Sequence, residues 1–173
     1  ANTAEGSFAA ADVDAAPRQV AALLVAEHAD VMTFYEPRGV TGHPDHIQVH
    51  RVGRRAAELA GVRRVYEGTV NRSEIQRFAS MAAEVGVEIP EGVDLEHLGL
   101  PDEQITTAVD VREHLAAKRA SMAAHASQIG ETSVFLATPE PYFGEVWGTE
   151  WYVRRDWAGP GREDSLFDGL AAA

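Results

Sequence analysis

The sequence contains no cysteine and little positive charge, and each of these shortages excludes certain kinds of site or partner. Without cysteine there are no disulfides, thiolate metal sites or cysteine nucleophiles, so His, Asp and Glu remain as the metal ligands to consider. Fifteen Lys and Arg stand against 27 Asp and Glu, which gives a net charge of -12. Such a charge opposes binding to a phosphate backbone, so we expect no nucleic-acid partner.

Long apolar runs are also missing. No stretch approaches the roughly 20 residues needed to cross a bilayer, and the N-terminal sequence ANTAEGSFAAADVD lacks the basic and apolar regions of a signal peptide. We therefore expect a cytoplasmic protein without a membrane partner. The length of 173 residues and the hydrophobic content of 45% are typical of a single globular domain covering residues 1–173.

Helical and strand patterns alternate along most of the chain. The expected helices cover residues 11–29, 44–60, 72–86 and 111–130, and the expected strands cover 31–35, 62–70 and 105–111. Residues 88–104 are rich in Pro, Gly and acids and are expected to form a surface loop. This order predicts a layered α/β fold with a mostly parallel sheet flanked by helices. In such sheets, functional sites lie at the carboxyl ends of strands.

Three of the seven histidines fall within GHPDHIQVH, just after the strand expected over 31–35. Pro44 is favoured at the first position of a helix, which puts His43 at the cap and His46 in the first turn. His43, His46 and His50 are three and four residues apart, so they share one helix face. The helix N-terminus disfavours added positive charge and helps to keep an imidazole neutral. The pattern is compatible with metal binding, with proton transfer, and with a structural polar face.

The sequence GHPDHIQVH, followed by RAAELAG and later by KRASMAAHASQI and GTEWYVRR, resembles the C-terminal half of the PIG-L, or LmbE-like, deacetylases. The resemblance runs from the first expected helix to Tyr152 and points to the mycothiol-type branch of deacetylases and amidases. It implies a Rossmann-like fold and a Zn2+ cofactor. It also implies removal of an acetyl group, or cleavage of a related amide, from an N-acylated amino sugar such as N-acetylglucosaminyl-inositol or a mycothiol-type conjugate.

The resemblance also implies roles for individual residues. His46, the last residue of HPDH, matches a zinc ligand of the family. His43 matches the histidine that acts as general acid or stabilises the oxyanion, and Asp45 matches a residue that supports it. Glu150 and Tyr152, in GTEWYVRR, are candidate substrate contacts.

Other polar residues keep two interpretations. His50 has no family role to transfer and is expected to pack or to face solvent. Lys118, His125 and Gln128 lie on the helix expected over 111–130, either on its polar face or in support of the site.

The resemblance is incomplete in two respects. The family's other metal residues belong to an N-terminal His-Pro-Asp-Asp-Glu motif, and neither that motif nor the family's first strand is found in this sequence. Thr41 stands where several bacterial members carry a tyrosine that polarises the scissile carbonyl. A catalytic zinc commonly has three protein ligands, so one histidine does not hold it firmly. We expect the C-terminal part of a deacetylase, or alternatively a non-catalytic α/β module that binds its missing N-terminal segment, another partner or a second copy.

Overall fold

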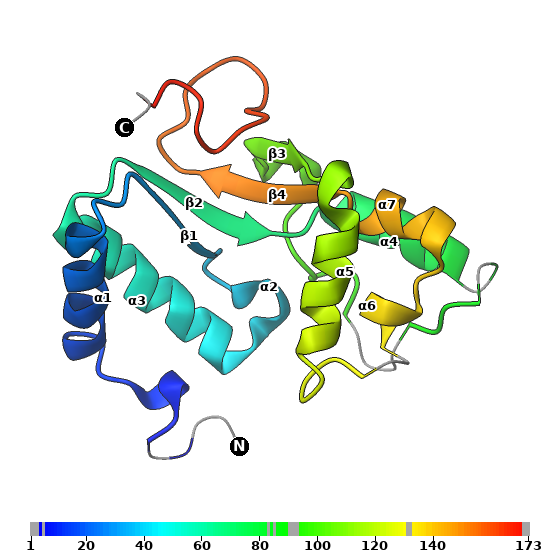
Figure 1. The fold of residues 1–173 in the computed structure, drawn as a ribbon, viewed down its shortest axis with the longest axis horizontal. Helices are drawn as coiled ribbons and strands as arrows, with labels where there is room; N and C mark the ends of the chain where they lie inside the picture. Colours follow the sequence, from blue (N-terminus) through cyan, green and yellow to red (C-terminus); the bar gives the residue numbers. More distant parts are fainter. Residues whose placement is uncertain are drawn as a thin grey trace.

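The fold comes from a computed structural model that describes residues 4, 6–82, 84, 86–89, 94–130 and 133–170. These residues form one four-stranded sheet and a set of helices around it (Figure 1). The strands are β1 (Val31–Tyr35), β2 (Arg64–Thr69), β3 (Thr107–Asp110) and β4 (Thr149–Arg154). The α-helices are α1 (Ala15–Ala26), α2 (Gly39–Gly42), α3 (Pro44–Ala60), α4 (Arg72–Ala82), α5 (Leu115–Ala124), α6 (Val134–Ala137) and α7 (Glu140–Trp147). The 3-10 helices are η1 (Phe8–Ala10), η2 (Asp102–Gln104) and η3 (Arg112–His114).

The sheet has the strand order β1-β2-β4-β3. β1 and β2 are parallel, and β4 is antiparallel to both β2 and β3. Three strands therefore run in one direction, and β4 runs against them. The reason is local: a single residue separates α7 from β4, and β4 starts where β2 ends, so it can only run back along β2. The predicted α/β class with flanking helices is confirmed, and the antiparallel strand makes the sheet mixed.

Several predicted boundaries agree with the structure. β1 and α3 have the expected limits, and β2 and β3 lie inside the expected ranges. Gly61 follows α3 with φ +66, as a glycine just past a helix end commonly does. At the start of α4, Oδ1 of Asn71 accepts the N–H of Ser73 at 3.1 Å, which satisfies a main-chain donor that the helix itself cannot.

The helix predicted over 111–130 is wrong at both ends. Its first turn is η3, and α5 stops at Ala124. The N–H of His125 bonds to the oxygen of Met122 at 3.1 Å, so the last turn tightens. Nδ1 of His125 lies 2.8 Å from the oxygen of Ser121 and takes over the acceptor that the helix would have used. A side chain thus replaces the main chain where the helix ends.

Three further differences from the prediction concern helix and loop limits. The first helix is shorter than the expected 11–29, because Oδ1 of Asp12 accepts the N–H groups of Asp14 and Ala15 in a turn before α1. α4 ends at Ala82, and residues 83 and 85 of its expected continuation lie outside the described residues. The expected loop 88–104 contains η2, and its residues 90–93 also lie outside the described residues. In the described part of the chain, no helix is long and apolar enough to span a membrane.

Close packing of α3 against β1 positions the histidine cluster. Gly53 faces Phe34 so closely that a Cβ at Gly53 would lie 2.7 Å from the phenyl ring. Ala56 and Ala57, which are also buried, continue the contact surface of α3. α1 packs along α3 (Figure 1). Because α3 begins after β1 ends, its N-terminal turn lies at the carboxyl end of β1.

The remaining helices gather at the opposite end of the molecule. In Figure 1, α4, α5, α6 and α7 lie beyond the carboxyl end of β2, at the right of the view. Their apolar side chains form a small core around Phe78, Ala82 and Val87, against which Val134 and Val146 pack. The two groups of helices therefore face each other across the carboxyl ends of the parallel strands.

Candidate functional site

His46 is held in one tautomer by the turn before α3. Its Nδ1 lies 3.1 Å from the main-chain oxygen of Gly39, which is an acceptor only, so Nδ1 carries the proton. The lone pair then belongs to Nε2. The ring of Tyr35 stacks on the imidazole with the ring centroids 4.2 Å apart, which fixes the plane of the ring. A metal-binding histidine has this arrangement, in which a carbonyl holds one nitrogen and leaves the other for the cation.

His43 is the N-cap of α3 and is held in the opposite tautomer. Its Nδ1 accepts the peptide N–H of Asp45 at 3.2 Å. In a neutral ring the proton is therefore on Nε2, where it can be donated. The rings of His43 and His46 have their centroids 5.0 Å apart. One turn of helix thus places a proton donor beside a nitrogen lone pair.

His50 lies in the contact between α3 and the sheet. It is 8% exposed, and its Nδ1 lies 3.0 Å from the oxygen of Tyr35 and 3.8 Å from Oε1 of Glu67. Its ring also meets Phe34 edge-on. This position agrees with the packed interpretation of His50 and separates it from the two other histidines of the motif.

Two adjoining cavities open beside the first turn of α3, which carries His43 and His46 and is called the histidine turn below. The His46 cavity, of about 780 Å³, is lined by His46, Thr41, Glu150 and Tyr152 among others. The structure therefore brings the predicted metal ligand and both predicted substrate contacts to one cavity. His43 and Asp45 line neither of the two cavities.

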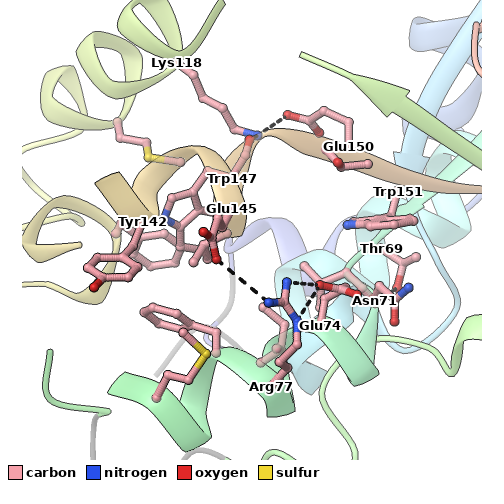
Figure 2. Close-up of a pocket in the computed structure, with 18 of the residues that line it drawn as sticks. Thr69, Asn71, Glu74, Arg77, Lys118, Tyr142, Glu145, Trp147, Glu150 and Trp151 are labelled. Atoms are coloured by element: carbon pink, nitrogen blue, oxygen red, sulfur yellow. Dashed lines mark hydrogen bonds and ion pairs between the residues drawn. The ribbon is translucent and has the colours of Figure 1, made fainter. Parts of the chain in front are cut away.

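The second cavity, the Lys118 cavity, has a volume of about 380 Å³ and lies between α4, α5, α7 and the start of β4 (Figure 2). It shares Tyr35, Glu150 and Trp151 with the His46 cavity, so the two spaces are continuous along these residues. The cleft formed by both cavities lies at the carboxyl ends of β1 and β2, where α/β sheets commonly carry their sites.

Glu150 connects the two cavities chemically. Its Oε1 lies 2.7 Å from Nζ of Lys118, which also donates to the oxygen of Trp147 at 2.6 Å. Burial raises the pKa of Tyr152 to about 12, and the charge of Glu150 and its hydrogen bond to the phenol add to the effect. Tyr152 is therefore a protonated donor at neutral pH.

The polar residues predicted on the helix after residue 110 lie in different surroundings. Lys118 lines the cleft, whereas His125 and Gln128 follow the end of α5 and are exposed. Sequence reasoning missed Glu74, Arg77 and Glu145, which line the Lys118 cavity. They carried no usable signal, because acidic and basic residues three apart on a helix are common on solvated surfaces.

A zinc ion is implied by the resemblance, and the described residues fit one position of its site. Nε2 of His46 has the required lone pair, and His46 lines a cavity. Among the residues that the structure describes, no group of three or more His, Asp and Glu side chains is close enough together to hold a metal ion. His46 thus fits one position of such a site.

The fold and the cleft define a class: an α/β protein with two histidines in the first turn of a helix, at the carboxyl ends of parallel strands. No protein-family profile matches the chain. Relatives called 1D-myo-inositol 2-acetamido-2-deoxy-alpha-D-glucopyranoside deacetylase are similar to it. The protein from Geodermatophilus obscurus is 36% identical over 98% of this chain and 65% of its own length. The proteins from Salinispora arenicola and Thermomonospora curvata are 36% and 34% identical over 96% and 94% of this chain. The chain covers 65%, 59% and 62% of the three relatives, or about three fifths of their length.

Proposed function

We propose that the chain belongs to the PIG-L or LmbE-like family and forms the C-terminal part of a zinc-dependent N-deacetylase. The proposed substrate is an N-acetylated amino sugar joined to a polyhydroxylated ring, such as N-acetylglucosaminyl-inositol, or a related mycothiol-type amide. The observation that carries the proposal is the similarity, at 36% identity over nearly the whole chain, to a deacetylase of such a compound. The histidine turn supports it, because it combines a lone pair and a donor proton in one helical turn.

Each histidine has a separate task in this proposal. His46 would hold zinc through Nε2, since Gly39 occupies the other nitrogen. Bound zinc would lower the pKa of a water molecule towards neutrality. His43 carries a proton on Nε2 and would donate it to the oxygen of the scissile amide or to the departing amine. The reaction adds one water across the amide bond and gives acetate and a free amine.

The other zinc ligands would come from a polypeptide segment outside this sequence. The relatives are longer than this chain. The resemblance to the family implies that the other ligands follow an N-terminal strand. β1 offers a place for such a strand: among the described residues it pairs only with β2, and its VMTFY sequence carries no charge or proline to discourage pairing. A parallel strand added beside β1 would end next to His46.

A second proposal of another class uses the same edge. The chain would then be a non-catalytic α/β module that pairs with a partner, or with a second copy, through β1. The exposed edge favours association whether or not a metal is held nearby.

The test combines this chain with a separately made N-terminal segment of the Geodermatophilus relative, because the chain covers 65% of that protein. We expect a complex by size-exclusion chromatography, bound zinc by elemental mass spectrometry, and acetate released from the relative's substrate. His46→Ala removes zinc and acetate release, whereas His125→Ala, on an exposed residue, leaves both unchanged. Undiminished hydrolysis by His46→Ala would contradict the enzyme proposal. A complex without zinc or hydrolysis would favour the module, and no association at all would contradict the pairing at β1.

A further inference from the structure

The Lys118 cavity is not used by the chemistry proposed above. Three helices and β4 supply its charged groups, which approach it from two sides (Figure 2). Lys118 and Glu150 lie on one side. Arg77 and Glu74 of α4 and Glu145 of α7 lie on the other. A cavity of about 380 Å³ with a few convergent polar groups has the size and character of a small-molecule site.

The charges in this cavity are paired, which indicates the kind of ligand it accepts. Arg77 reaches Oε2 of Glu74 at 2.6 Å and Oε2 of Glu145 at 3.8 Å. Lys118 reaches Oε1 of Glu150 at 2.7 Å. Two cations thus face three carboxylates, so the cavity has no surplus of positive charge for an anion. It does present donors and acceptors side by side, and a hydroxyl group uses both.

Lys118 retains hydrogen-bonding capacity. An ammonium group has three N–H donors, and the structure gives this one two acceptors, Glu150 and the oxygen of Trp147. Its side chain is only 19% exposed, so the remaining donor lies in a partly dehydrated environment. Hydrogen bonds from a charged donor are stronger than those from a neutral one, particularly away from water.

Aromatic rings supply the apolar part of the cavity. Trp151, Trp147 and Tyr142 line it together with the paired charges (Figure 2). Sugars and cyclitols have C–H groups on their ring faces and hydroxyls at their edges, so an aromatic surface next to paired charges matches both parts. Trp151 also borders the His46 cavity, which places this aromatic surface at the junction of the two spaces.

We propose that the Lys118 cavity binds a neutral polyhydroxylated ring, with Trp151 and the Lys118 and Glu150 pair as the residues that select it. The proposal rests on the proposed function for the identity of that ring: it is the one attached to the N-acetylated sugar, whose amide lies in the His46 cavity. Tyr35, Glu150 and Trp151 line both cavities, so a two-ring ligand can extend from one to the other. Binding of the second ring requires neither zinc nor hydrolysis.

Lys118 makes a direct test possible, because it is the only lysine in the sequence. Labelling the chain with ¹³C at lysine Cε gives one methylene signal from the cavity. We expect myo-inositol to shift this signal saturably, with a Kd on the order of 1 mM for so small a ligand. Glycerol, which has hydroxyls but no ring, should not saturate it. Either no saturation by myo-inositol, or an equal saturable shift with inorganic phosphate, would overturn the proposal.

Variants locate the binding. Glu150→Gln and Trp151→Leu should each weaken myo-inositol binding about ten-fold, which matches the loss of one good contact. Arg63→Gln is the control, because it also breaks an ion pair but lies outside both cavities. An unchanged Kd in both folded cavity variants would contradict the assignment. If neither variant folds, the myo-inositol titration of the unsubstituted chain is the test. Inositol binding without hydrolysis by the assembled protein would refute only the enzyme proposal, and hydrolysis without inositol binding would refute only this one.

Discussion

The main-chain oxygen of Gly39 accepts the Nδ1 proton of His46 at 3.1 Å, and the two residues also restrict each other sterically. A Cβ at Gly39 would lie 2.6 Å from Cβ of His46 and 2.8 Å from the nitrogen of Ile47. The φ of Gly39 is +64, in the left-handed region that favours glycine. The tautomer of His46 thus depends on a glycine seven residues earlier in the sequence.

The first prediction follows from this contact. Gly39→Ala should lower the free energy of unfolding by about 2–4 kcal/mol, because it adds a steric clash to left-handed strain. Gly42→Ala is the matched control: φ is +79 there and no atom lies within 4 Å of the added Cβ, so only the strain of about 1 kcal/mol remains. Urea denaturation of the two variants measures the difference. Equal losses would mean that the turn before α3 relaxes without cost.

A second prediction concerns His50. His50→Ala should destabilise the fold by about 2 kcal/mol, because it removes the hydrogen bond to the oxygen of Tyr35 and opens space beside Phe34. His125→Ala, at an exposed position, should change stability by less than about 0.5 kcal/mol. Urea denaturation again provides the measurement. A His50→Ala chain as stable as the control would show that His50 is not a structural link between α3 and the sheet.

The third prediction is a pH effect at Tyr152, whose pKa is raised to about 12 by burial and by Glu150. Raising the pKa of a phenol favours its neutral form in the folded chain. The resulting stabilisation is complete below the ordinary value of 10.0 and is lost as the pH rises towards about 12. Glu150→Gln removes the charge and should lower the pKa of Tyr152. Ultraviolet titration, with Tyr152→Phe to identify the signal, tests this, and an unchanged pKa would leave burial as the sole cause.

A fourth prediction concerns acid stability. Hydrogen bonds from Arg162 and Asn71 lower the pKa of Asp102 below its ordinary value of 3.8. The stabilisation is therefore complete above about 3.8 and is lost as the pH falls through the lower folded-state value. Asp102→Asn should cost under about 1 kcal/mol at neutral pH, because this carboxylate is half exposed. The cost should shrink in acid when unfolding is followed against pH. A cost that does not depend on pH would assign it to packing.

Local signals were enough to predict the elements that carry the histidines. Pro44 and Gly61 mark the two ends of α3, and the apolar run from Val31 to Tyr35 predicts the limits of β1. The run has the composition of a buried strand, but within β1 only Phe34 is buried, and Thr33 and Tyr35 are exposed. The end of α5 was not predictable in this way, because the side chain of His125 competes for a carbonyl of its own helix. The direction of β4 was not predictable either. It depends on α6 and α7, whose short sequences have too little periodicity to be recognised.

The candidate site, like the fold, was predictable from local sequence only in part. The positions of His43 and His46 in one helical turn follow from their spacing. The approach of Glu150 and Tyr152 to His46 depends on the order of strands in the sheet, which no local pattern contains. The resemblance to a family provided these two residues, and the structure brings them to the His46 cavity. The position of Lys118 in the cleft could be recognised only from the contact between α5 and β4.

The close approach of Gly53 to Phe34 makes this point of α3 the contact about which the helix would rotate. Gly53 is the point where the helix bears on the sheet, and His46 lies seven residues away, about 10 Å along the helix axis. A side chain added at Gly53 would tilt α3 about this contact, and the displacement would be greatest at the two ends of the helix. A substitution at Gly53, which itself lines neither cavity, would therefore change the reach of His46 into the His46 cavity.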